Sequence, residues 1–167
     1  MTTFIGSPIT SSGLTLISAQ TPAAVNTITF NTGLSTSYKG YAILLTLTHS
    51  EAHTCRLRFN ADSANNYNMW GPLTGAPLTL PVTTAQSGVI IATTGGVDSS
   101  QFWITIPAAP VGGNYPISLS GSPINVSTAG TKWSLGGVWL SAAALTSINV
   151  SCSSGDFTGK ITLYGFN

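Results

Sequence analysis

The chain has 167 residues, enough for one domain, but only five are Lys or Arg and four are Asp or Glu, about 5% where globular domains average about 25%. Its net charge of +1, without clusters of Lys and Arg, disfavours nucleic acid as a partner, because phosphate binding needs such clusters. The longest apolar runs fall far short of the ~20 residues that span a bilayer, so no membrane insertion is expected. The first residues, MTTFIGSPITSSG, lack the basic and apolar regions of a signal peptide.

Short segments of alternating apolar and hydroxyl-bearing residues recur along the whole chain, separated by 18 Gly and 9 Pro. This pattern predicts an all-β, single-domain, antiparallel β-sandwich of jelly-roll type with about 8–11 short strands. We expect residues 1–13 to form an extended N-terminal arm, residues 14–167 the sandwich, and residues 61–76 the longest loop. The predicted strands are 14–19, 25–31, 40–48, 53–60, 77–82, 88–93, 101–107, 115–120, 132–140, 146–152 and 158–166.

Alternation within these strands predicts which side chains point into the sandwich. In 53–60, Cys55, Leu57 and Phe59 share the inward face, opposite Arg56 and Arg58. By the same rule, Phe102, Ile104 and Ile106 point inward in 101–107, Val138 and Leu140 in 132–140, and Ile161 and Leu163 in 158–166.

Four aromatic residues then fall on outward faces: Trp103, Trp139, Tyr164 and Phe166. A lone monomer rarely exposes such side chains, and Trp is enriched at interfaces. For the two tryptophans we consider cover by a loop or a subunit contact. For Tyr164 and Phe166 a subunit contact is the sharper interpretation. Together with the low charge, this predicts a protein assembled with copies of itself or with a larger surface.

Two cysteines, Cys55 and Cys152, occupy inward positions of two predicted strands. Without a secretion signal we expect two buried free thiols that pack as small apolar groups. A disulfide is the alternative, and it would need the two Cα atoms within ~7 Å.

Candidate catalytic groups are scarce. The four carboxylates, Glu51, Asp62, Asp98 and Asp156, all fall in predicted turns, where such residues usually bond their own backbone. No nucleophile elbow or phosphate-binding glycine loop precedes a helix, because no helix is predicted. We therefore expect a non-enzymatic protein without a cofactor.

Two turns carry possible ligands. His49 and His53 flank Glu51 in a predicted hairpin turn, which is either a surface metal contact or, as we favour, a solvated turn. Residues 62–68 are rich in oxygen ligands and could hold Ca²⁺ weakly, although an Asx turn at Asp62 explains them better. Asn65, Tyr67 and Trp70 also form a plausible contact for a sugar or a protein.

Three segments resemble the small structural proteins encoded by tailed bacteriophages: residues 16–48, LRFNADSANNYN at 57–68, and 136–167, which closes on FTGKITLYG. The resemblance implies a virion surface component built on a jelly-roll sandwich, usually a homotrimer. One implied role is a capsid decoration (cement) protein, bound to the major capsid protein on the outside of the head, with residues 1–13 reaching the shell. The other is a tail-fibre or receptor-binding protein that contacts a host glycan or protein.

Overall fold

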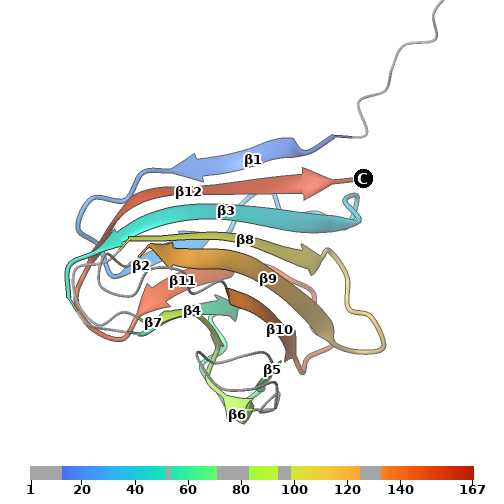
Figure 1. Cartoon of the computed structure of the whole chain (residues 1–167). Helices are drawn as coiled ribbons and strands as arrows, with labels where there is room; N and C mark the ends of the chain where they lie inside the picture. Colours follow the sequence, from blue (N-terminus) through green and yellow to red (C-terminus); the bar gives the residue numbers. More distant parts are fainter. Residues whose placement is uncertain (1–12, 52–53, 71–82, 94–98, 125–132) are drawn as a thin grey trace, which may run out of the picture.

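The computed structural model describes residues 13–51, 54–70, 83–93, 99–124 and 133–167, and these form strands and turns without a helix (Figure 1). Within this described part there is accordingly no helix long and apolar enough to cross a membrane. The strands are β1 (Thr15–Gln20), β2 (Thr27–Phe30), β3 (Gly40–His49), β4 (Thr54–Phe59), β5 (Tyr67–Trp70), β6 (Thr83–Gln86), β7 (Val89–Thr93), β8 (Ser99–Pro107), β9 (Tyr115–Ile124), β10 (Trp133–Trp139), β11 (Ile148–Cys152) and β12 (Phe157–Phe166).

The strands form two antiparallel sheets packed as a β-sandwich, which confirms the predicted fold class. The larger sheet has eight strands in the order β1-β12-β3-β8-β9-β10-β5-β6, and the smaller has four in the order β2-β11-β4-β7. Figure 1 shows β1, β12, β3, β8 and β9 side by side in one layer, with β2, β11, β4 and β7 in the other. The last strand, β12, lies between β1 and β3, so the end of the chain is built into the sheet.

The core fills the space between the sheets, and the predicted alternation explains most of it. Cys55, Leu57 and Phe59 of β4 are fully buried, as are the inward residues of β8 and β12: Phe102, Ile104, Ile106, Ile161 and Leu163. Burial of such side chains supplies the main driving force of folding, at about 1.5–3 kcal/mol for each large apolar group.

The loop predicted at 61–76 contains a strand. Tyr67–Trp70 forms β5, which pairs with β10 and with β6 at the far end of the larger sheet. The predicted strand at 77–82 lies outside the described residues, as do residues 1–12 of the predicted arm.

Trp139 is buried, and the prediction that it points outward was wrong. Its indole is 2% exposed and packs between Phe59, Tyr67 and Tyr115, with ring centroids 5.3–6.4 Å away. Its Nε1 donates a hydrogen bond to Asp62 Oδ2 at 2.7 Å, so the polar end of the ring is satisfied. Leu140, which we expected inside, follows the end of β10 and is 44% exposed.

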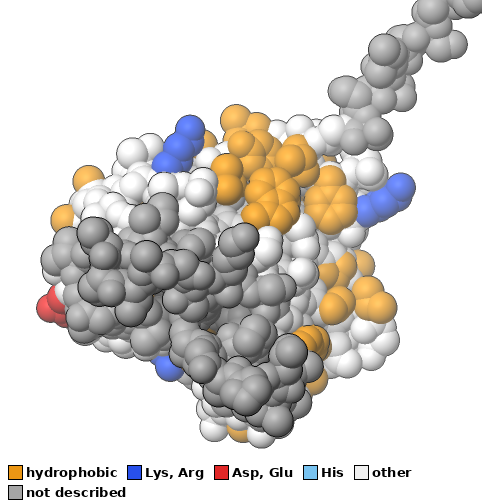
Figure 2. All heavy atoms as spheres, viewed as in Figure 1, with side chains coloured by type: hydrophobic (Ala, Val, Ile, Leu, Met, Phe, Trp, Pro, Cys, Tyr) orange, Lys and Arg blue, Asp and Glu red, His pale blue; other side chains and the backbone are white. Residues whose placement is uncertain are grey.

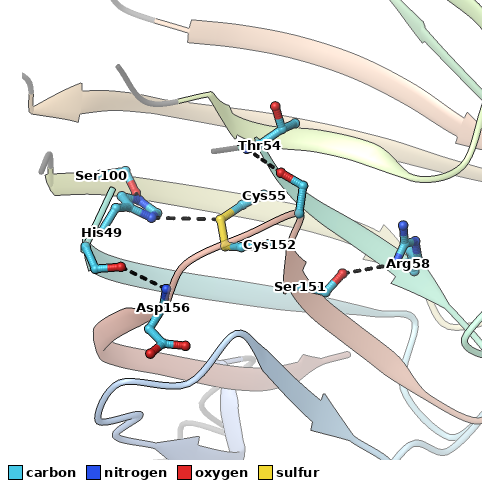
Figure 3. The surroundings of a disulfide bond; sticks show 10 residues. His49, Thr54, Cys55, Arg58, Ser100, Ser151, Cys152 and Asp156 are labelled. Carbon is cyan, nitrogen blue, oxygen red and sulfur yellow. Dashed lines mark hydrogen bonds between the residues drawn. A yellow bond between two sulfur atoms is a disulfide. The ribbon is translucent and has the colours of Figure 1, made fainter. Parts of the chain in front are cut away.

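The two cysteines form a disulfide, which corrects the expectation of free thiols. Cys55 of β4 and Cys152 of β11 are direct partners in the register of the smaller sheet, with Cα atoms 4.0 Å apart (Figure 3). The two cysteines are 97 positions apart in the sequence, and they can bond because β4 and β11 are neighbours in the sheet. Inward parity had placed each cysteine correctly but could not reveal that they face one another.

Candidate functional site: the outer face of the larger sheet

The outer faces of the two sheets differ in chemistry. The outward positions on three strands of the smaller sheet are polar: Thr27, Thr29, Arg56, Arg58, Asn149 and Ser151. Several of them bond to one another or to the nearby backbone: Arg58 donates to Ser87 O at 2.7 Å and to Ser151 Oγ at 3.1 Å, and Asn149 donates to Thr29 Oγ1 at 2.7 Å. These three strands therefore present a polar and largely hydrogen-bonded surface, although the Nε of Arg56 is buried without a hydrogen-bond partner among the described residues.

The outer face of the larger sheet instead carries large apolar side chains on β1, β12, β3 and β8. We call these residues the aromatic face: Leu16, Leu44, Trp103, Tyr164 and Phe166. Trp103 and Tyr164 stack with ring centroids 6.5 Å apart and planes 30° apart. Figure 2 shows hydrophobic side chains gathered over this part of the molecule, with Lys or Arg side chains at the edges of the group.

Strand register explains why these side chains meet. Leu16 is opposite Tyr164 across β1 and β12, and Leu44 is opposite Trp103 across β3 and β8. Between them Ala42 is completely buried although it lies on the outer face, since its neighbours close over it. Leu16 itself remains 59% exposed, so the aromatic face is covered only in part by its own side chains.

Phe166 forms one wall of a hollow at the end of this face. Its ring lies over Gly40, where a Cβ atom would collide with it. The hollow has a volume of about 390 Å³, and five apolar and three polar residues line it: Ile106, Pro107, Pro116, Ile117 and Phe166, with Lys39, Thr105 and Ser118. Among the described residues that line it, Lys39 carries the one charged side chain, and it is exposed.

Trp70 extends the apolar character of the same sheet face towards β5. Its register partner is Gly136 of β10, and a Cβ atom on Gly136 would overlap the Trp70 indole. The glycine therefore allows the ring to lie flat on the sheet. Trp70 stays 38% exposed.

The structure separates the predicted interaction residues into three groups. Trp103, Tyr164 and Phe166 lie on the outer face of the larger sheet, as their strand parity predicted. Trp70, which was expected in a loop, lies on the same face, and Asn65 is exposed in the turn before β5. Tyr67 and Trp139 are buried in the core, so their assignment to a surface was wrong. Leu16 and Leu44 were not identified, because isolated leucines in a strand carry no signal of exposure.

Tyr67 is bound into the core, and Asp62 is hydrogen-bonded to a core side chain from the turn before β5. The Tyr67 hydroxyl accepts a hydrogen bond from Phe59 N at 2.9 Å, and burial raises the pKa of this phenol far above its ordinary value. Asp62 accepts from Ala64 N and Asn66 Nδ2 as well as from Trp139, which confirms the Asx-turn interpretation of residues 62–68. Its partial burial would raise the pKa of this carboxyl, but the hydrogen bonds from Asn66, Trp139 and Ala64 outweigh it and lower the pKa.

A second cluster was missed by sequence reasoning. His49 is 1% exposed, not part of a solvated turn, because it occupies an inward position at the end of β3 in line with Leu45 and Leu47. Its ring lies against the disulfide, and the ligand atoms of His49, Cys55 and Cys152 are all within 4.8 Å of one another. His53 lies outside the described residues.

No protein-family model matches the chain, and no curated protein sequence matches it significantly.

Proposed function

We propose that the chain is a non-enzymatic structural protein of a bacteriophage virion, a homotrimeric capsid decoration (cement) protein that binds the major capsid protein on the outside of the head. The observation that carries the proposal is the contrast between the two faces of the sandwich. The smaller sheet presents hydrogen-bonded polar groups, whereas the larger sheet presents stacked aromatic rings that a lone subunit leaves partly in water. Such a face suits contact with another protein surface.

The strand pairing supports the jelly-roll part of the proposal. Four pairs are nested like one long hairpin: β1 with β12, β2 with β11, β3 with β8, and β4 with β7. Successive pairs alternate between the two sheets, as they do when such a hairpin is wrapped into two Greek keys. In this interpretation β5, β6, β9 and β10 are additions that widen one sheet.

In this proposal the aromatic face joins copies of the chain, and residues 1–13 form the arm that reaches the shell. A trimer presents three equivalent contacts, so a weak contact for each subunit becomes a strong one for the assembly. Because the trimer binds only assembled shells, its binding stabilises the shell by linkage.

The test separates the two surfaces. Replacing Trp103 and Tyr164 by Ser should convert the trimer into folded monomers, measured by light scattering coupled to size exclusion, whereas the control Thr27→Ala on the smaller sheet should leave the trimer intact. Removing residues 1–13 should leave a trimer that no longer sediments with undecorated heads. A truncated protein that still decorated heads and protected them from heat would refute the cement mechanism.

The hollow beside Phe166 favours a second candidate, a tail-fibre or receptor-binding protein. A concave, mostly apolar hollow with one aromatic ring, two hydroxyl groups and a cation suits a sugar unit of a host glycan better than it suits a flat protein contact. A protein of this kind should adsorb to host cells and block infection, and Phe166→Ala should abolish both effects. A cement protein should show neither effect.

A further inference from the structure

His49, Cys55 and Cys152 come from three strands that meet at one end of the sandwich (Figure 3). His49 ends β3, whereas Cys55 and Cys152 lie opposite one another in β4 and β11. His49 Nδ1 is 3.8 Å from Cys55 Sγ. Since both sheets fix these backbone positions, the three side chains stay together whether or not the sulfur atoms are bonded.

Ser100 holds the imidazole in this orientation. His49 Nε2 lies 2.8 Å from Ser100 Oγ, and the serine is completely buried. A serine hydroxyl can either donate or accept, so it serves both tautomers of the ring. Beside a disulfide, Nδ1–H can donate to sulfur while Ser100 donates to Nε2. Beside a metal ion, Nε2–H can donate to Ser100 while the lone pair of Nδ1 binds the ion, which is how ligating histidines are usually oriented.

We propose that the reduced protein binds one zinc ion through the thiolates of Cys55 and Cys152 and Nδ1 of His49. A dithiol supplies two electrons and two protons, which cleave the S–S bond to two thiols while the dithiol becomes a disulfide. Zn²⁺ then displaces the two thiol protons and forms two Zn–S bonds and one Zn–N bond. Two thiolates with one imidazole form a donor set that zinc accepts, with water as the fourth ligand.

A hollow of about 240 Å³ borders His49 on the outside of the core and is lined also by Ala24, Thr48, Ser50, Asp156 and Thr158. The disulfide and the zinc site use the same sulfur atoms, so the two states exclude one another. In a reducing compartment the metal would tie β4 to β11, and in an oxidising one the disulfide would do so.

The first experiment uses the full chain, reduced with a dithiol and desalted without oxygen, and titrates it with Co²⁺ as a spectroscopic probe of zinc sites. We expect a thiolate-to-cobalt absorption band that saturates at one equivalent and disappears when Zn²⁺ is added. The oxidised chain and Cys152→Ser should not give the band, whereas the control Ser153→Ala, one residue away, should retain it. His49→Gln should weaken binding and change the spectrum.

The second experiment needs no variant, because the loss of a cysteine could prevent folding. One equivalent of Zn²⁺ should slow alkylation of both thiols in the reduced wild-type chain at least about tenfold, and a chelator should restore the rate, since a metal-bound thiolate is not free to react. Equal alkylation rates with and without Zn²⁺, or a cobalt spectrum without thiolate bands, would overturn the proposal.

Discussion

Reduction of the Cys55–Cys152 disulfide provides a quantitative test of the fold. The bond closes a loop of 97 residues, and the chain-entropy model predicts that it stabilises the folded state by about 4.7 kcal/mol. This is an upper estimate, because the unfolded chain keeps some residual structure that the model ignores. For a domain of this size, with a urea m-value of about 2 kcal/mol/M, it corresponds to a loss of roughly 2 M in the unfolding midpoint.

The assay is urea unfolding monitored by tryptophan fluorescence, with and without a dithiol and always with a chelator. The chelator removes any contribution from bound metal. The double variant of Cys55→Ala and Cys152→Ala is the control, and its midpoint should not respond to the dithiol. If reduction freed both thiols and left the wild-type midpoint unchanged, the bond would not cross-link distant strands of one fold. Two free thiols in the untreated chain would refute the disulfide itself.

Three further predictions concern single side chains. Gly159→Ala should cost about 2 kcal/mol or more, because its φ is +135° and its Cβ would meet the backbone of the neighbouring strand, whereas Gly112→Ala, at φ +61° in open space, should cost only about 1 kcal/mol. Tyr67→Phe should cost about 1–3 kcal/mol, because it leaves the buried N–H of Phe59 without its acceptor. Asp62→Asn should destabilise the protein at neutral pH, and because the folded-state pKa is lowered, the difference should shrink as acid protonates the wild-type carboxyl.

Urea unfolding measures the stability change in all three cases, and a different result would contradict each prediction. Equal costs at the two glycines would mean that the neighbouring strand yields to the added methyl group. Tyr164→Phe on the aromatic face is the control for Tyr67, and an equal loss in both variants would argue against the buried hydrogen bond. A difference between Asp62→Asn and wild type that stayed constant from neutral to acidic pH would show that the charge of Asp62 does not matter.

Local alternation was sufficient to predict most of the strands, β5 and β6 excepted, and most of their inward faces. In β4 the sequence TCRLRF alternates without interruption, and the burial of Cys55, Leu57 and Phe59 follows it. In β5 only four residues alternate between turn-forming neighbours, so the strand was taken for a loop. A segment this short is a strand because β10 and β6 pair with it, and such pairing is not encoded locally.

The features that bear on function depend on which distant strands are neighbours. Parity predicted that Trp103 and Tyr164 point outward. Their rings stack because β8 and β12 lie on either side of β3 in the sheet, and no local pattern reveals this strand order. The disulfide and the cluster around His49 depend in the same way on the pairing of β11 with β4. Sequence reasoning could find the members of these groups but could not assemble them.

Trp139 shows how a single wrong parity arises and what decides it. We expected Val138 and Leu140 inside because two aliphatic residues outnumber one tryptophan. Because side chains alternate between the faces of a strand, this choice put Trp139 on the wrong face. The buried indole removes more apolar area from water than either neighbour could, provided that its N–H finds an acceptor. Asp62 supplies that acceptor from the turn before β5, so the carboxylate that seemed a possible calcium ligand is the partner that allows the ring to enter the core. The parity of β10 was therefore set by a polar group 77 residues away in the sequence.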